Sequence, residues 1–347
     1  MSDDSPPHRR RVRYKGTHPR RYQEKYKELD PLRFAEEAGK VEARGQTSAG
    51  THRSIMVDEV MDRLSPKPGE SALDATLGYG GHAREIMLRL RPGGHLVGLD
   101  MDPIEMPRTE ARLREEGFGE DIFSARRINF AGLPALIPLT GPFDCILADL
   151  GASSMQIDNP ARGFTFKADG PLDLRFNPRR GKPASSLLAG LSEIDLAELL
   201  VTNSDEPFAR QIAHTLCTVE EPIISTRQFA EIIRGVLLAA GFDRSAPQTR
   251  ASLQRCFQAL RIAVNDEGGV LDQFLAYLPG ALKPGGRVVI LSFHSGEDRR
   301  VKKSFQKGLR AGVYADIAAS PERPSHEERR SNPRSSSTKL RWAVKTQ

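Results

Sequence analysis

Residues 71–102, SALDATLGYGGHAREIMLRLRPGGHLVGLDMD, decide the fold. A short apolar run ends at Asp74, a glycine loop follows at residues 78–82, and apolar residues then recur at helical spacing. Pro92 and two glycines end this helix, and a second apolar run leads into Asp100. The order of strand, glycine loop, helix, strand and carboxylate is typical of a nucleotide-like ligand lying across the carboxyl ends of parallel strands. The sequence therefore predicts an α/β fold of the Rossmann type.

Two classes of ligand use such a loop. A dinucleotide site has the pattern G-x-G-x-x-G directly after the first strand, whereas this chain has G-x-G-G-H, preceded by Asp74. A carboxylate at this place repels a pyrophosphate but attracts the sulfonium and ammonium groups of S-adenosylmethionine. We therefore predict S-adenosylmethionine as the cofactor, with a dinucleotide as the alternative. A plain strand-to-helix turn is a further alternative, but it leaves Asp100 unexplained.

The composition is that of a globular protein. The chain has 347 residues, of which 38% are hydrophobic, enough for one large core or two modest ones. No apolar run approaches the roughly 18 residues that span a bilayer, and residues 1–30 lack the apolar segment of a secretory signal. We therefore predict a cytoplasmic protein with no membrane partner. The cysteines are far apart and odd in number, which predicts buried thiols rather than disulfides or a zinc site: Cys145, Cys217 and Cys256.

The basic charge is concentrated at the two ends of the chain. The net charge of the whole chain is +6, and residues 1–27 alone carry nine Lys or Arg and three Asp or Glu. Residues 296–347 hold 13 basic and 6 acidic side chains. Such ends favour a polyanionic partner, most simply nucleic acid, although a solvated arm that binds nothing has the same composition. We predict that residues 1–50 form a flexible basic arm.

Two later apolar runs predict further strands of the same sheet. Residues 122–128 are followed by Phe130, whose ring could stack on an adenine or simply pack in the core. Residues 142–150 form a short apolar run that is typical of a buried parallel strand and contains Asp149 near its end. Because substrate and cofactor meet at the carboxyl ends of the central strands in such sheets, we predict that Asp149 is a functional carboxylate.

The strand pattern breaks after residue 158. Residues 159–183 mix aromatic, basic, glycine and proline residues, so this loop could hold a splayed-out base and its phosphates or could be purely structural. Helical periodicity then runs through residues 185–278, and RVVIL at 287–291 predicts a fifth strand. We therefore predict three parts after the arm: a first core segment at 51–158, a loop and all-helical insertion at 159–265, and a second core segment with a basic C-terminal tail at 266–347.

Two histidines fall at the predicted ligand end of the sheet. His82 lies in the glycine loop and His294 follows the fifth strand. Neither has a cysteine or carboxylate at the usual spacing of metal ligands. We therefore predict that they contact cofactor or substrate, or are structural, and that the chain has no metal site.

Several blocks of sequence together resemble the bacterial 16S ribosomal RNA cytosine-N4 methyltransferase family, also called MraW. The blocks occur in order along the chain: DATLGYGGH at 74–82, LDMDP at 99–103, DLGASSMQID at 149–158, RGFTF at 162–166, DGPLDLR at 169–175, FQALRIAVN at 257–265, SFHSGED at 292–298 and NPRS at 332–335. The resemblance extends from about residue 50 to residue 345.

The resemblance implies a class I Rossmann-like S-adenosylmethionine-dependent methyltransferase with an inserted all-helical substrate domain. The implied substrate is the exocyclic amine of a cytosine in the decoding region of 16S rRNA or the small ribosomal subunit. The implied cofactor contacts are Gly80, Gly81, His82, Asp100, Phe130, Asp149 and Gln156. Asp149 is also our candidate catalytic acceptor for the amine. The candidates for substrate binding are Ser153, Ser154, Arg162, Phe164, Arg175 and His294.

The chain departs from the family pattern in places where RNA would be bound. The usual leucine of SFHSLED is Gly296, the segment 246–256 is longer than usual, and the basic arm has no usual counterpart. None of these changes removes an implied cofactor contact. Two alternatives therefore stay open: a divergent paralogue that methylates another RNA or DNA site, and a non-catalytic RNA-binding or ribosome-assembly protein. The sequence does not indicate an oligomeric state.

Overall fold

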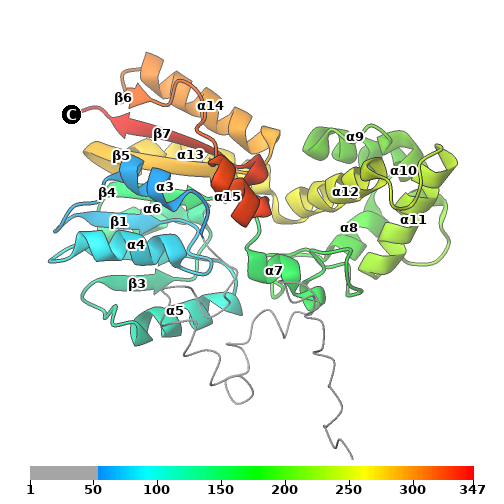
Figure 1. Cartoon of the computed structure of the whole chain (residues 1–347), viewed down its shortest axis with the longest axis horizontal. Helices are drawn as coiled ribbons and strands as arrows, with labels where there is room; N and C mark the ends of the chain where they lie inside the picture. Colours follow the sequence, from blue (N-terminus) through cyan, green and yellow to red (C-terminus); the bar gives the residue numbers. More distant parts are fainter. Residues whose placement is uncertain (1–53) are drawn as a thin grey trace, which may run out of the picture. The chain divides into compact units, whose positions relative to one another are not determined.

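The computed structural model describes residues 54–347, so the predicted arm at residues 1–50 lies outside the described residues. The described chain is built on a seven-stranded sheet with the strand order β3-β2-β1-β4-β5-β7-β6 (Figure 1). The strands are β1 (Ser71–Asp74), β2 (His95–Leu99), β3 (Phe123–Arg126), β4 (Phe143–Asp149), β5 (Leu282–Ser292), β6 (Tyr314–Ile317) and β7 (Lys339–Lys345).

The strand order reverses at the centre of the sheet. Strands β1 to β5 are parallel, whereas β7 pairs antiparallel with β5 and β6 pairs antiparallel with β7. The chain moves outward from β1 to β2 and β3, and then returns to place β4 on the other side of β1. In open α/β sheets the ligand binds beyond the carboxyl ends of the strands at such a reversal. The predicted Rossmann-like architecture is confirmed, and Asp74 and Asp149 are the last residues of the two central strands.

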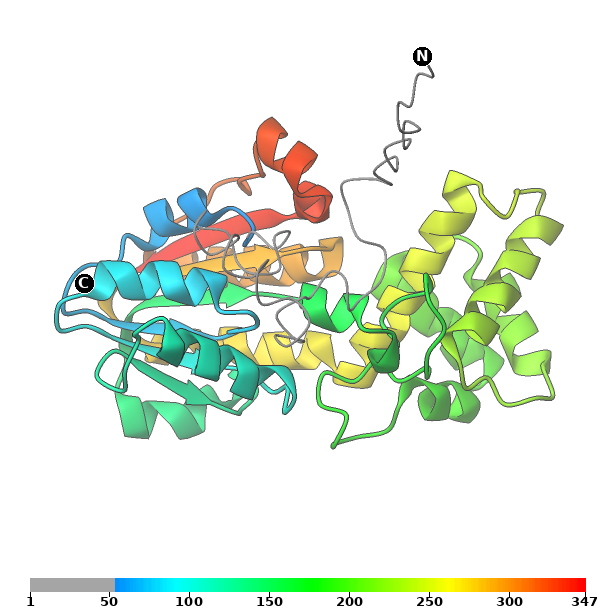
Figure 2. The same ribbon diagram turned by 60° about the horizontal axis from the view of Figure 1, so that its bottom comes forward.

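Helices cover both faces of the sheet (Figures 1 and 2). One hydrophobic cluster joins one face to α3 (Val57–Leu64), α4 (Gly81–Leu90) and α5 (Glu105–Glu115). A second cluster joins the opposite face to α6 (Leu133–Thr140), α13 (Glu267–Ala281) and α14 (Ser295–Arg310). The sheet is therefore the middle layer of three, and the loops at its carboxyl edge are free to form a site.

The segment between β4 and β5 contains a hydrophobic core of its own. After α7 (Ser154–Asp158) and a loop, five helices follow: α8 (Ala184–Gly190), α9 (Glu193–Ser204), α10 (Ala209–Thr218), α11 (Thr226–Ala239) and α12 (Pro247–Asn265). Their buried residues form one cluster with Phe164 and Leu172 of the loop. The next helix, α13, packs against the sheet instead. The boundary that we predicted at residue 265 falls between α12 and α13, and the division into parts stays a prediction.

The C-terminal segment is part of the sheet rather than a tail. It forms α14, β6, α15 (His326–Ser331) and β7, and β7 pairs along the length of β5. Lys339 and Arg341 both form ion pairs with Asp298, and Arg334 pairs with Asp158. The residues that we predicted to form a basic tail therefore include a strand of the sheet and side chains that form ion pairs within the fold.

All three cysteines are free thiols. Cys145 and Cys256 are buried as predicted, but Cys217 is exposed near the end of α10, so the prediction is wrong for that residue. Within residues 54–347, no helix combines the length and the apolar character needed to cross a membrane.

The loop after α7 is so tightly packed that the addition of a single methyl group should disturb it. An added Cβ at Gly170 would overlap the carbonyl oxygen of Pro160, whereas a Cβ at Gly190 would meet nothing within 4 Å. We expect Gly170→Ala to lower the free energy of unfolding by about 1–3 kcal/mol, because the overlap forces the backbone to shift. Urea unfolding would measure this loss. The matched control Gly190→Ala should be neutral, and equal effects of the two changes would contradict the loop packing.

Candidate active site

The glycine loop joins β1 to α4 at the reversal of the strand order. Gly78 and Gly80 have φ angles of 49° and 78°, in the left-handed region that favours glycine. A side chain at Gly81 would overlap the hydroxyl of Ser54, which lies against this glycine. The predicted contacts Gly80, Gly81 and His82 thus lie at the start of α4, where backbone can approach a ligand closely.

Asp100 follows β2 and is held by the same loop. Its Oδ2 accepts a hydrogen bond of 2.9 Å from the backbone N–H of Gly78, and its Oδ1 accepts one of 2.8 Å from that of Asp102. Burial raises the pKa of Asp100 to about 6. A fixed carboxylate at the end of the second strand can accept from ribose hydroxyls, as the sequence predicted.

Asp149 and His82 turn hydrogen-bond acceptors toward the same place. The Nε2 of His82 lies 2.9 Å from the carbonyl oxygen of Ile55. Because a carbonyl only accepts, Nε2 carries the proton, and Nδ1 presents a lone pair 3.7 Å from Oδ2 of Asp149. Burial lowers the pKa of His82, which keeps the ring neutral. Oδ1 of Asp149 is buried without a hydrogen-bond partner in the described part of the chain. A ligand that donates N–H groups would satisfy both side chains.

Three carboxylates gather at this edge of the sheet. Burial is the largest cause that raises the pKa of Asp74 to about 6, of Asp100 to about 6 and of Asp149 to about 7. The charges of Asp100 and Asp149 raise the pKa of Asp74 further, and the charge of Glu297 does the same for Asp149. A cationic ligand would relieve this repulsion. The site therefore fits S-adenosylmethionine, which carries a sulfonium and an ammonium group.

A buried network connects the cofactor edge to the loop after α7. The carboxylate of Asp102 is almost fully buried, and its Oδ2 accepts from Nε2 of Gln156 at 2.8 Å and from Nη1 of Arg162 at 2.7 Å. Arg162 also donates through Nη2 to the carbonyl oxygens of Arg175 and Phe176. The sequence singled out Gln156 and Arg162 but missed Asp102, which stands in the LDMDP block two residues after Asp100.

The predicted substrate contacts in this loop are engaged within the protein. Arg162 is committed to Asp102, Arg175 donates through Nε and Nη2 to Asp173, and Phe164 is buried and stacked on Phe176 with ring centroids 5.8 Å apart. Their contacts support a role in shaping the loop rather than in gripping RNA. The sequence analysis missed the exposed basic residues of the same loop, although they follow one another closely in the chain: Arg179, Arg180 and Lys182.

The remaining predicted residues lie around the same edge. Ser153 caps α7 and forms a capping box with Gln156, whose Oε1 accepts from the Ser153 backbone at 2.9 Å. Ser154, the first residue of α7, is half-buried. Phe130 packs edge to face on Phe274 with centroids 5.2 Å apart. His294 follows β5, and its Nε2 lies 3.3 Å from Oε1 of Glu297.

The reversed parallel sheet, the glycine loop and the carboxylates that suit a cationic cofactor together define the class of S-adenosylmethionine-dependent methyltransferases. The sequence profile of the MraW methylase family matches residues 49–346, and the chain belongs to this family.

Similar proteins differ in the share of this chain that they cover. The chain is 49% identical over 348 residues to "Ribosomal RNA small subunit methyltransferase H 2" of Alkaliphilus metalliredigens, covering 99% of this chain and 100% of that relative. It is 48% identical to "Ribosomal RNA small subunit methyltransferase H 1" of Lachnoclostridium phytofermentans, over 99% of this chain and 94% of the relative. For "Ribosomal RNA small subunit methyltransferase H" of Koribacter versatilis the identity is 39%, over 85% of this chain and 94% of the relative. The first two alignments include the arm.

Asp149 gives the clearest prediction about stability. Its pKa is raised to about 7 in the folded protein from an ordinary value of 3.8. A group whose pKa is raised by folding stabilises the folded protein at pH values below its ordinary pKa. This contribution is lost as the pH rises through the pKa that the group has in the folded state. Asp149→Asn removes the buried charge, so we expect its melting temperature relative to the wild type to rise by several degrees between pH 4 and pH 8. Thermal unfolding of the cofactor-free protein at several pH values would measure the difference.

The control is Asp62→Asn, which removes a carboxylate from the exposed side of α3. A difference for Asp149→Asn that does not change with pH would contradict the burial of a charged group at the site.

Proposed function

We propose that this chain transfers a methyl group from S-adenosylmethionine to the exocyclic N4 of a cytosine in the decoding region of 16S rRNA. The observation that carries the proposal is the unsatisfied carboxylate of Asp149 at the end of the central strand β4. Membership of the MraW methylase family and the names of two relatives that each align with 99% of this chain support the RNA substrate.

The reaction needs an acceptor for the amine. The lone pair of a cytosine N4 is delocalised into the ring, so the amine is a poor nucleophile. A carboxylate that accepts a hydrogen bond from N4–H draws electron density toward the nitrogen and fixes its direction. Asp149 is held for this task, because its backbone N–H donates to Oγ1 of Thr76 at 2.6 Å. The bound cofactor supplies an electrophilic methyl group.

The cofactor contacts that we propose are Gly80, Gly81, His82, Asp100, Phe130, Asp149 and Gln156. Asp100 would accept from the ribose hydroxyls, and Asp149 and the Nδ1 of His82 would accept from N–H groups. Asp102 and the Ser153 backbone fix the orientation of the Gln156 amide. Gln156 would therefore contact the cofactor through the amide N–H that does not donate to Asp102.

The target base must leave its stack to reach the carboxyl edge of the sheet. We propose that the loop at 159–183 lies against the RNA through its exposed Arg179, Arg180 and Lys182. Ser153, Ser154 and His294 remain proposed contacts to the substrate. Since bacterial ribosomes are cytoplasmic, we expect the reaction to take place there.

Methyl transfer to small ribosomal subunits tests the proposal directly. Subunits from cells that lack this protein would be incubated with labelled S-adenosylmethionine and the modified base mapped. We expect one N4-methylcytosine in the decoding region and a loss of at least a hundredfold in kcat for Asp149→Ala, because the amine loses its acceptor. A methyl group at another nucleotide would instead support the paralogue. Cofactor binding without transfer to any RNA would support a non-catalytic role.

The N-terminal arm gives a separate prediction. Residues 1–27 carry nine Lys or Arg against three acids, and relatives that align with 99% of this chain extend over most of the arm. Deletion of residues 1–50 should weaken RNA binding and reduce the slope of log K against log salt concentration by roughly 0.7 for each phosphate group that the arm neutralises. Affinity for S-adenosylmethionine should not change. An unchanged salt slope would show that the arm does not contact RNA.

A further inference from the structure

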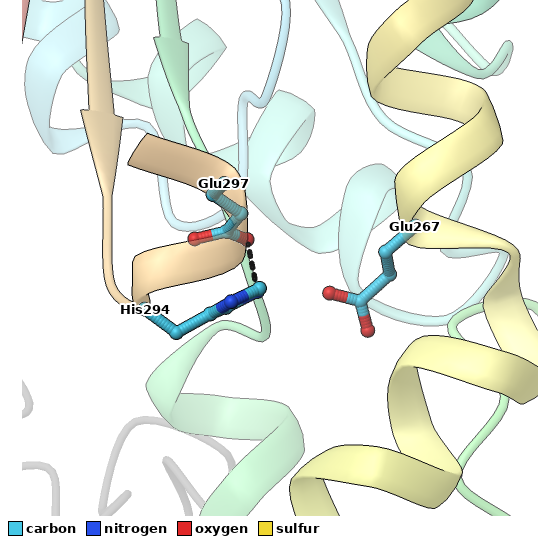
Figure 3. Close-up of side chains that lie close together, drawn as sticks. All are labelled: Glu267, His294 and Glu297. Carbon is cyan, nitrogen blue, oxygen red and sulfur yellow. Dashed lines mark ion pairs between the residues drawn. The ribbon is translucent and has the colours of Figure 1, made fainter. Parts of the chain in front are cut away.

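A cluster of three ionisable side chains lies where β5 ends and α14 begins. His294 and Glu297 come from the start of α14, and Glu267 is the first residue of α13. One potential ligand atom from each residue lies within 4.8 Å of the others. Figure 3 shows the carboxylates of Glu297 and Glu267 approaching the imidazole of His294 from different sides. The fold brings Glu267 to a histidine that follows it by 27 positions, so local sequence spacing could not reveal the cluster.

The cluster is largely shielded from solvent, and one of its nitrogen atoms has no hydrogen-bond partner among the described residues. The side chains of His294, Glu297 and Glu267 are 16%, 6% and 10% exposed. The Nε2 of His294 is buried and makes no hydrogen bond within the described residues, although Oε1 of Glu297 lies 3.3 Å away. One imidazole nitrogen with two carboxylates is a donor set that suits Mn²⁺ or Zn²⁺, whereas Mg²⁺ and Ca²⁺ prefer oxygen ligands alone.

Neighbouring groups fix both carboxylates. Oε2 of Glu297 accepts from the backbone N–H of Phe293 at 2.8 Å, and the oxygens of Glu267 accept from Nε and Nη2 of Arg261 at 2.7 and 3.0 Å. Such outer hydrogen bonds orient the carboxylates of metal sites.

Gly296 permits the observed position of the imidazole. A Cβ at this residue would lie 3.1 Å from Nδ1 and Cε1 of His294, which is tighter than ordinary contact. The family pattern has leucine at this position. Gly296 is therefore a departure from that pattern, and it leaves room for the ring position that completes the cluster.

A cavity beside the cluster leaves space for an ion and its water ligands. Its volume is about 290 Å³, and its lining includes Asn203 and Asp266 in addition to the three clustered side chains. Further oxygen donors are therefore at hand to complete a coordination shell.

We propose that Glu267, His294 and Glu297 bind one divalent metal ion of the Mn²⁺ or Zn²⁺ class. The ion would join the start of α13 to the start of α14, next to the end of the strand that pairs with β4. His294 is also a proposed substrate contact, but metal binding is measured without RNA or S-adenosylmethionine, so it can fail independently of the proposed reaction.

Titration of the full chain with the metal alone tests the proposal. After removal of metal with a chelator, calorimetry with Mn²⁺ and with Zn²⁺ should each show one ion per chain. His294→Ala and Glu267→Gln should each weaken binding at least tenfold, because each removes one ligand. The matched control is His214→Ala on α10, where an exposed histidine lies 3.0 Å from Glu193 in a pair without a second carboxylate. This control should bind as the wild type does.

Two further measurements distinguish loss of the metal site from loss of folding. Gly296→Leu keeps all three ligands and should still weaken binding at least tenfold, because it displaces the ring. The electron paramagnetic resonance of bound Mn²⁺ in the wild type should show coupling to one nitrogen nucleus, which needs no variant. Absence of binding, or binding without nitrogen coupling, would overturn the proposal and leave an ion pair between His294 and Glu297. Unchanged affinity in Glu267→Gln and His294→Ala would overturn it equally.

Discussion

The crowding of negative charge at one edge of the sheet is the constraint on which the site depends. Parallel strands deliver their carboxyl ends to the same edge, and here β1, β2 and β4 each lead into an aspartate. Backbone N–H groups satisfy part of Asp74 and Asp100, through Thr76 at 3.0 Å and Gly78 at 2.9 Å. Asp149 receives no such bond among the described residues at its Oδ1. The edge is therefore built for a positively charged partner, and the glycine loop gives that partner room.

A second constraint is the buried ion pair of Asp102 and Arg162. Their side chains are 1% and 5% exposed, so removal of either partner would leave an uncompensated buried charge at a cost of about 3–5 kcal/mol. The pair fixes the loop at 159–183 relative to the turn that carries Asp100. One carboxylate thus joins the turn after β2 to this loop, and it also orients Gln156.

The sequence predicted the features that depend on local pattern. The glycine loop, the buried strand that ends at Asp149 and the change from strand to helical periodicity all lie within short windows, and the fold follows from them. It failed where a side chain is paired with a distant one. Arg162 is of a type that binds phosphate groups, but Asp102, 60 residues away in the chain, holds it. The C-terminal charges suggested a tail because their partner Asp298 lies about 40 residues away in the chain. His294 and Glu267 meet only because α13 and α14 pack on the same face of the sheet.

The position of β7 has a consequence for the timing of folding. This strand is the last element of the chain, yet it lies between β5 and β6 and pairs with the strand that leads into His294. Contacts between elements so far apart in sequence form late, and domains synthesised from the N-terminus cannot close around a strand that has not yet been made. The carboxyl edge therefore lacks the support of β7 until residues 339–345 have been made and have paired with β5. The sheet is thus completed in a different order from that in which its strands are made.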